Sequence, residues 1–311
     1  MEQFDVIVVG AGPAGLSAAL ILGRALRRVL VLDAGHPRNE RSRELHGFLT
    51  RDGTPPLELL KMGREQLTKY ETVEVRGATV KHIERSADEF ILTCTDDTKY
   101  AALKVLLATG VVDRLPDVEG IRDFYGTSVF HCPYCDGWEL RGLPLAAWGR
   151  GASGVSLAVK LTNWSGDVVL CTDGSDDLND EQRERLQRFN VDVREEPIAR
   201  LEGEHGALQA VRFKNDQVLP RRALFFSAGN YLRTELAPTI GCRISEKGYV
   251  LTHDCESCDV PGLYVAGDAM GGTHMAIVAA ADAASAAVAI NMALTEDEYP
   301  FKQLHPAYAQ R

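Results

Sequence analysis

The sequence lacks an excess of positive charge, a long uninterrupted apolar run and an even number of cysteines. Its 311 residues carry a formal net charge of −10, which would repel nucleic-acid phosphates, so we expect no nucleic-acid partner. No apolar run approaches the roughly 20 residues that a membrane helix needs, so we expect no membrane-spanning segment. Seven cysteines in so long a chain are not typical of the disulfide framework of a small secreted protein.

The N-terminus also lacks the basic segment of a secretory signal, because an apolar strand pattern begins there almost at once. A reducing cytoplasm fits this pattern and the cysteine content. The length favours two domains. Hydrophobic residues make up 45% and charged residues 25% of the chain, as in an ordinary globular protein. We therefore expect a cytoplasmic protein with two domains.

Residues 132–137 read Cys-Pro-Tyr-Cys-Asp-Gly. Two cysteines separated by two residues can close a small disulfide ring, and one thiolate can be stabilised by the other cysteine, which lowers its pKa and makes it the nucleophile. Asp136 follows the second cysteine directly, where a carboxyl can give or take the proton that thiol exchange requires. Cys132, Cys135 and Asp136 are therefore the predicted catalytic residues.

Half of a zinc site is the alternative interpretation of the same cysteine pair. Cys255 and Cys258 have the same spacing and can supply the two ligands that zinc would still need. The residues alone leave this alternative open.

Residues 10–15 read Gly-Ala-Gly-Pro-Ala-Gly and lie between an apolar strand pattern at 5–9 and a helical pattern. A second strand pattern follows and ends at Asp33. The glycines permit a tight turn and close approach to a pyrophosphate, the helix N-terminus supplies amide donors, and the acid can bind a ribose hydroxyl. The unit predicts a bound dinucleotide.

A second unit of the same kind begins with the strand pattern at 145–148 and the turn Gly149-Arg150-Gly151-Ala152-Ser153-Gly154. Its second strand pattern, 168–172, ends at Asp173. The repetition predicts an enzyme with two dinucleotide sites. A domain of the same shape that has lost its ligand is a strong alternative.

Other segments carry weaker signals. The loop from residue 36 to 60 could line a cofactor through Asn39 and His46, although a loop histidine satisfied by its neighbours is the more ordinary interpretation. Strand patterns end in Ala108-Thr109-Gly110 and in Gly267-Asp268. Asn179 is expected to cap a helix over 179–190.

Five motifs in order resemble the low-molecular-weight thioredoxin reductase family over nearly the whole chain. They are VVGAGPAG with Asp33, LLATG (106–110), CPYCDG (132–137), GRGASG (149–154) and GLYVAGDA (262–269). The resemblance implies an α/β fold with two Rossmann-like domains of three layers. An FAD domain (1–112 and 244–311) would be interrupted by a nicotinamide-type domain (113–243) that carries the disulfide. It also implies a homodimer, and it disfavours the zinc site, because the family's cysteines must reach a flavin.

The resemblance further assigns roles to residues. In this family the second cysteine faces the flavin and the first meets the protein substrate, so these roles fall to Cys135 and Cys132. Asp268 would hold the ribityl chain of FAD. The predicted cofactor-binding residues are Gly10, Gly12, Pro13, Ala14, Gly15, Asp33, Asn39, His46, Ala108, Thr109, Gly110, Gly267 and Asp268, and no metal ligand is predicted.

One departure concerns NADPH. The family places a pair of arginines after the strand that follows its second glycine motif, where this chain reads Cys171-Thr172-Asp173-Gly174-Ser175-Asp176-Asp177. We expect NADPH to be a poor electron donor, because carboxylates repel a 2′-phosphate. The sequence leaves two alternatives for the electron donor: NADH, or a donor that is not a nicotinamide. Trp148 and Arg150 are expected to crowd the glycine turn, whereas one of Arg183, Arg185 and Arg188 could still swing toward a phosphate.

Three functions follow. The first is a flavin-dependent disulfide oxidoreductase that exchanges electrons with a thioredoxin-like protein. The second is an FAD-dependent oxidase of a small dithiol with oxygen as acceptor. In those oxidases a histidine often stands at the place of Asp136, which favours the first function. The third is a redox-responsive flavoprotein that only binds a partner, and the intact Cys-Pro-Tyr-Cys-Asp segment counts against it. The aromatic tail (299–311) has no assigned role.

Overall fold

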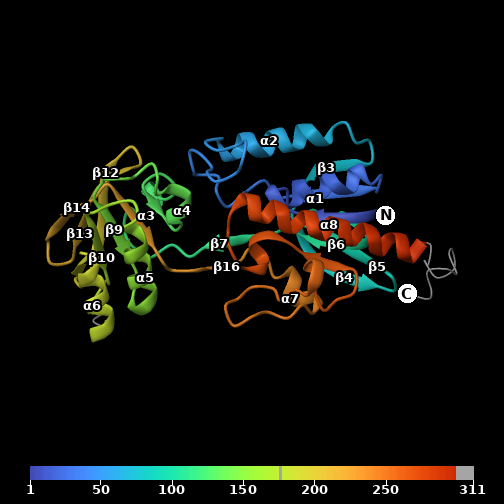
Figure 1. The fold of residues 1–311 in the computed structure, drawn as a ribbon. Coiled ribbons are helices and arrows are strands. Elements are labelled where there is room, and N and C mark those ends of the chain that lie inside the picture. The colour runs from blue at the N-terminus through green and yellow to red at the C-terminus, as the bar shows by residue number, and fades with distance from the viewer. Residues whose placement is uncertain (175–176, 299–311) are drawn as a thin grey trace, which may run out of the picture. The chain divides into compact units, whose positions relative to one another are not determined.

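The computed structural model describes residues 1–174 and 177–298, and this part of the chain divides into two compact units (Figure 1). The first unit comprises Met1–Arg38, Leu57–Val112 and the chain from Tyr231 onward, and the second comprises Asn39–Pro56 and Asp113–Asn230. The predicted aromatic tail and Asp176 lie outside the described residues.

The first unit contains a seven-stranded sheet in the order β3-β2-β1-β6-β5-β4, with β17 paired to β6. Strands β3, β2, β1, β6 and β17 run parallel, and β4 and β5 are antiparallel additions. The sheet strands are β1 (Glu2–Val9), β2 (Val29–Asp33), β3 (Val73–Gly77), β4 (Val80–Ser86), β5 (Glu89–Cys94), β6 (Lys99–Leu107) and β17 (Leu263–Val265). The helices are α1 (Pro13–Arg24), α2 (Pro56–Leu67), α7 (Leu236–Ile240), α8 (Ala276–Glu298) and the 3-10 turns η1 (Asp254–Glu256) and η2 (Gly267–Met270).

The second unit contains a five-stranded parallel sheet in the order β11-β10-β9-β15-β8 and a three-stranded antiparallel sheet β12-β13-β14. Its strands are β8 (Val129–Phe130), β9 (Leu145–Trp148), β10 (Val168–Cys171), β11 (Asp192–Arg194), β12 (Ile198–Glu204), β13 (Ala207–Phe213), β14 (Val218–Pro220) and β15 (Ala223–Phe226). Its helices are α3 (Ile121–Phe124), α4 (Pro133–Asp136), α5 (Gly151–Leu161) and α6 (Asp180–Arg188). The predicted Asn179 cap is confirmed, because its side chain accepts from the Gln182 N–H in a capping box.

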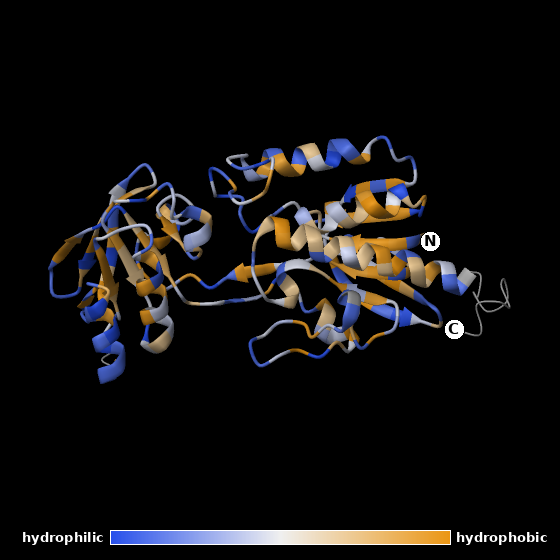
Figure 2. Cartoon of the chain, viewed as in Figure 1, coloured by the Kyte–Doolittle hydropathy of each residue, from blue (hydrophilic) through white to orange (hydrophobic). Residues whose placement is uncertain are grey.

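Hydropathy explains the layering of both units. Figure 2 shows hydrophobic residues concentrated in the strands, whereas α6 is mostly hydrophilic. Val6, Ile7 and Val8 of β1 are fully buried, as expected of a central parallel strand covered on both faces. The two-domain α/β fold predicted from the sequence is confirmed.

The unit boundaries differ in detail from the predicted domains. The chain rejoins the first unit at Tyr231 rather than at residue 244. The reason is that β16 (Asn230–Leu232), where the chain returns to the first unit, pairs with β7 (Val111–Asp113), where the chain leaves it. Leu236 and Ala237 already lie in the first unit's core. Residues 39–56 group with the second unit, where Arg41 donates to the Arg122 carbonyl over 2.7 Å.

Helix α8 bears on the expectation that no segment spans a membrane. By length and composition alone it could cross a membrane, although the sequence has no unbroken apolar run of that length. Its fully buried residues recur every three or four positions and belong to the core that α1 and the sheet share: Ala283, Ala286, Ala287, Ile290 and Leu294. The Ser17 hydroxyl of α1 donates to the Ala280 carbonyl, and α1 and α8 lie side by side (Figure 1). This is the pattern of a helix packed on a sheet.

The turn between β1 and α1 depends on glycine. A Cβ on Gly15 would lie 1.8 Å from the Gly10 carbonyl oxygen, and Gly10 itself has a φ of +106°. Around the second glycine of the motif, Gly12, no other atom of the described residues lies within 4 Å of the position of a Cβ. A side chain at position 15 would therefore clash with the backbone, whereas a side chain at position 12 would have room.

We expect Gly15→Ala to destabilise the protein strongly and Gly12→Ala to change its stability little. Overpacking costs about 1–3 kcal/mol even where side chains can move, and here the obstacle is backbone. Thermal unfolding of the cofactor-free protein, followed by circular dichroism, measures both. Equal melting temperatures for Gly15→Ala and Gly12→Ala would contradict this packing argument.

Candidate active site

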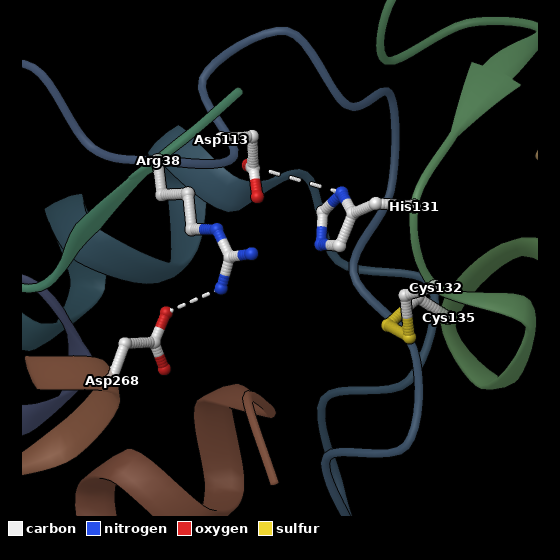
Figure 3. Close-up of a disulfide and its surroundings, with 6 residues drawn as sticks. All are labelled: Arg38, Asp113, His131, Cys132, Cys135 and Asp268. Carbon is white, nitrogen blue, oxygen red and sulfur yellow. Dashed lines mark hydrogen bonds and ion pairs between the residues drawn. A yellow bond between two sulfur atoms is a disulfide. The ribbon is translucent and has the colours of Figure 1, made fainter. Parts of the chain in front are cut away.

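Cys132 and Cys135 are joined by a disulfide at the start of α4 in the second unit (Figure 3). Cys132 stands just before the helix, and the Cys135 N–H donates to its carbonyl over 3.1 Å. Pro133 takes the first helical position, where its missing N–H and fixed φ are compatible with a helix. The predicted pair is therefore placed in a single helical turn, with a Cα–Cα distance of 5.3 Å.

Gly137 anchors this turn to the second unit. A Cβ there would lie 2.5 Å from the Pro133 carbonyl oxygen and 2.8 Å from the Trp164 ring. Trp164 also packs edge-on against Tyr134, at 5.5 Å between ring centroids. The turn is therefore seated on an aromatic side chain that follows α5.

Asp136 is the ionisable group next to the disulfide. Burial raises the pKa of its carboxyl to about 7; the charge of His46 opposes this shift, and the negative charge of Glu139 contributes to it. A carboxyl with this pKa is populated in both protonation states at neutral pH. It can therefore give or accept a proton there, as a general acid or base must.

A histidine lies next to the disulfide in the same unit. His131 precedes the disulfide, and its Nδ1 is 3.8 Å from Oδ2 of Asp113 (Figure 3). The same oxygen accepts a 2.6 Å hydrogen bond from the Tyr125 hydroxyl. This arrangement carries no signal in the sequence, because Tyr125 and Asp113 belong to no motif.

His46, predicted as a cofactor contact, lies among carboxylates of the second unit. Its ring nitrogens are 3.6 Å from Glu44, 3.5 Å from Asp52 and 3.6 Å from Glu139. These contacts are those of a loop histidine satisfied by its neighbours. Asn39 falls in the same segment of the second unit. Cofactor contact by Asn39 and His46 stays a prediction.

The other predicted cofactor-binding residues all lie in the first unit, at the carboxyl ends of parallel strands. Gly10 follows β1 and packs against the Ala108 carbonyl that follows β6, where its Cβ would be 2.4 Å from the oxygen. Gly267 follows β17, and its Cβ would lie 3.2 Å from that of Ala14. Three strand ends thus meet at one edge of the sheet, which is where α/β folds bind nucleotides.

Asp33 lies at the end of β2, beside this edge. Its Oδ1 accepts from the Ala11 N–H over 3.1 Å, and its Oδ2 pairs with Arg64. It borders a cavity of about 740 Å³ whose lining includes Gly35, Arg64, Arg76, Ala78 and Asp96. A cavity next to the acid at the end of the second strand is where the adenosine of a dinucleotide would lie.

These features fit the adenosine diphosphate half of FAD. Helix α1 begins at Pro13, and its N-cap residue Gly12 provides no side-chain cap and has open space beside it within the described part of the chain. Amides at the N-terminus of a helix bind phosphate. Asp268 of η2 adds a carboxylate, whose Oδ2 lies 2.8 Å from Nη1 of Arg38 (Figure 3). Arg38 and Arg64 belong to no motif, and only the fold brings them to the two predicted acids.

The second glycine motif has the same backbone but different surroundings. A Cβ on Gly154 would lie 2.4 Å from the Gly149 carbonyl oxygen. Asp173 has a φ of +54°, and its Oδ1 accepts from the Ile198 N–H over 2.9 Å. Oδ2 of Asp177 lies 3.7 Å from the position of a Cβ on Gly151, at the start of α5. A carboxylate therefore lies where a pyrophosphate would approach this helix.

The expectation that Trp148 crowds this turn is wrong. Its side chain is buried in the core with Val169 and Phe226, because it ends a central strand and faces inward. Arg150 does lie at the turn, and its Nη2 donates to the Asp173 carbonyl over 3.0 Å. Of the three helix arginines, Arg183 pairs with Glu195 at 2.9 Å.

Comparisons with known proteins agree with this architecture. Residues 4–285 match the model of the pyridine nucleotide-disulphide oxidoreductase family. The chain is 35% identical to a Bacillus anthracis protein named TrxB, whose crystal structure superposes with a TM-score of 0.90, covering 95% of this chain and all of that one. It is 28% identical to the "thioredoxin reductase aclD" of Aspergillus oryzae, over 95% of this chain and 98% of the relative.

A third relative, named "probable thioredoxin reductase", comes from Arthroderma benhamiae. It is 32% identical over 217 residues, which is 65% of this chain. The match spans 54% of that relative, so the chain corresponds to about half of its length.

We expect the Asp136 carboxyl to titrate with a midpoint near pH 7. Glu139→Gln should lower this midpoint, because it removes a negative charge that disfavours ionisation, and His46→Gln should raise it. Carbon-13 NMR of protein labelled at aspartate measures the midpoint, with Asp136→Asn assigning the resonance. A midpoint near 4, the value of an exposed aspartate, would contradict the burial of this carboxyl.

Proposed function

Since the chain belongs to the pyridine nucleotide-disulphide oxidoreductase family, within which it is similar to the low-molecular-weight thioredoxin reductases, we propose that it exchanges electrons between FAD and a thioredoxin-like protein through Cys132 and Cys135. It is a flavin-dependent disulfide oxidoreductase. The proposal rests above all on the disulfide of α4 next to a carboxyl with a pKa of about 7. A homodimer in the cytoplasm is part of the same proposal.

In the reducing direction, electrons pass from FAD through the dithiol of Cys132 and Cys135 to the disulfide of the partner. The Cys132 thiolate attacks one sulfur of the partner's disulfide, and the other partner sulfur leaves and takes up a proton. The Cys135 thiolate then attacks the Cys132 sulfur and releases the partner as a dithiol, so that Cys132 and Cys135 end as a disulfide. FAD, when bound, supplies the two electrons that restore their dithiol. Asp136 accepts and returns the proton of the thiol that faces the flavin.

The surface beside the disulfide supports a protein partner. Tyr134 is 64% and Trp138 is 65% exposed, and they are among the most exposed large apolar side chains of the described residues. Arg141 stacks over Trp138, with its guanidinium carbon 4.3 Å from the ring centroid. Exposed aromatic and arginine side chains are enriched where proteins bind one another. A partner that covers them would bring its own disulfide to Cys132.

Residues of the first unit would hold the FAD. The Gly12 turn and the N-terminus of α1 would bind its pyrophosphate, and Asp33 would bind the adenosine ribose. Asp268 would bind the ribityl chain, with Arg38 fixing the carboxylate. The remaining predicted contacts, including Ala108, Thr109 and Gly110, are proposed to line the same edge of the sheet.

Cysteine substitution tests the function. The purified protein should be yellow, and after chemical reduction under nitrogen its flavin should be reoxidised by thioredoxin. Cys132→Ser and Cys135→Ser should each abolish this reoxidation while FAD stays bound, and the control Cys255→Ser should keep it. Colourless protein that cannot be reconstituted with FAD would contradict the proposal. Rapid oxygen uptake with dithiothreitol and no reaction with thioredoxin would instead identify a small-dithiol oxidase.

NADPH is proposed to be a poor electron donor. Asp177 lies at the α5 turn, and Arg150 and Arg183 are already engaged with Asp173 and Glu195. A 2′-phosphate would therefore approach carboxylates, and both of these arginines already contact a carboxylate. NADH lacks this phosphate and avoids that part of the repulsion.

Stopped-flow mixing under nitrogen measures donor use. Micromolar NADPH should leave the flavin spectrum unchanged over seconds, whereas dithiothreitol should bleach it through Cys132 and Cys135. Rapid bleaching by NADPH would show that the phosphate is accepted. Bleaching by NADH alone would agree with the repulsion and would identify the donor.

A further inference from the structure

The first unit contains a second pair of neighbouring thiols. The sulfurs of Cys242 and Cys258 lie 2.8 Å apart, although the two residues are 16 positions apart in the sequence. Both are free cysteines, and their exposed fractions are 5% and 7%. The Cys-x-x-Cys spacing of Cys255 and Cys258 drew attention to this segment, but the fold brings Cys258 to Cys242, which belongs to no motif.

Backbone and ionic contacts fix both segments at this point. Cys242 follows Gly241, which has a φ of +109° and caps the C-terminus of α7. The Cys242 N–H donates to the Ala237 carbonyl over 3.0 Å. The Cys258 N–H donates to the Leu263 carbonyl over 3.2 Å, just before β17.

The residues that follow the two cysteines, Arg243 and Asp259, form an ion pair. Arg243 donates to both oxygens of Asp259, at 2.7 and 2.9 Å, and His253 contacts Asp259 at 2.9 Å. A two-pronged ion pair of this kind fixes orientation as well as distance. The sulfurs need to approach by less than 1 Å to reach the roughly 2.05 Å of a disulfide bond.

The two thiols have unequal surroundings. The sulfurs of Cys242 and Cys258 share a hydrogen bond, and the Val260 N–H also approaches the Cys258 sulfur, at 3.5 Å. These two contacts lower the pKa of Cys258, while the hydrogen bond between the sulfurs and burial raise the pKa of Cys242. Because the thiolate is the reactive form, Cys258 is the nucleophile of the pair. By contrast, burial raises the pKa of Cys94 in the same core cluster.

We propose that Cys242 and Cys258 form a second, reversible disulfide when the protein meets hydrogen peroxide. The Cys258 thiolate attacks a peroxide oxygen, forming a sulfenic acid and, after protonation, one water. The Cys242 sulfur then attacks the Cys258 sulfur and displaces a second water, so that two thiols and one peroxide give one disulfide and two waters. Their small exposed area admits an oxidant of this size rather than a protein disulfide.

The cross-link would join the residue after α7 to the segment that leads into β17 and η2. A covalent bond across this loop restricts the unfolded chain more than the folded one, in which the two sulfurs are already adjacent. Oxidation should therefore raise the melting temperature. This inference does not depend on electron transfer through Cys132 and Cys135, since its readouts are a bond and a stability.

The experiment uses the FAD-reconstituted full chain carrying Cys132→Ser and Cys135→Ser, so that the first disulfide cannot form. The protein is treated with hydrogen peroxide, denatured, alkylated, digested and analysed by mass spectrometry. We expect the peptides of Cys242 and Cys258 as one linked species, lighter by two hydrogen atoms than their sum and separated again by dithiothreitol. The melting temperature should rise on oxidation and return on reduction.

Matched variants distinguish this bond from general oxidation. Cys242→Ser should remove both the linked species and the rise in melting temperature, and should leave a Cys258 sulfenic acid that dimedone traps. Cys94→Ser, a change at another buried cysteine, should keep both effects. Separate alkylation of Cys242 and Cys258 after peroxide treatment, or a link from Cys258 to Cys255, would overturn the proposal.

Discussion

The first unit depends on the contact between Gly15 and the Gly10 carbonyl, where a single added carbon would lie 1.8 Å from the oxygen. This approach lets α1 begin immediately at the end of β1, with its free N-terminal amides at the edge of the sheet. Helix α8 in turn packs on α1 through small alanine side chains, so the same contact determines how the last helix covers the sheet. The ends of β6 and β17 then meet this turn, which places Ala108 and Gly267 beside it.

The second unit repeats the contact, with Gly154 against the Gly149 carbonyl, and yet its chemistry differs. In the first unit, the acid at the end of the second strand faces a cavity and is balanced by Arg64. In the second unit, Asp173 takes a left-handed conformation and satisfies the Ile198 N–H, while Asp177 lies at the helix start. Shared backbone geometry thus supports two different surfaces, because the ligand is recognised by the side chains around the turn rather than by the turn itself.

Burial shifts the pKa values of a carboxyl and of several thiols in the two units. Asp136 loses part of its hydration, so its carboxyl is populated in both protonation states near neutral pH. The thiols at Cys94 and Cys171 are buried without such use, and burial raises the pKa of each. At Cys242 and Cys258 a neighbouring sulfur counteracts burial for one thiol of the pair. The pKa shifts of these groups therefore follow their immediate neighbours more closely than their residue type.

The sequence by itself determined the two α/β units, the glycine turns, the Asn179 cap and the cysteine pair of the disulfide, because each depends on residues close together in the chain. Hydrophobic periodicity and turn chemistry are local, and Cys132 and Cys135 share one helical turn. Only the tertiary structure placed Arg38 against Asp268, turned Trp148 into the core, ended the second unit at Asn230 and brought Cys242 to Cys258. These features join segments far apart in the sequence, and no local pattern specifies which side chains meet when such segments pack.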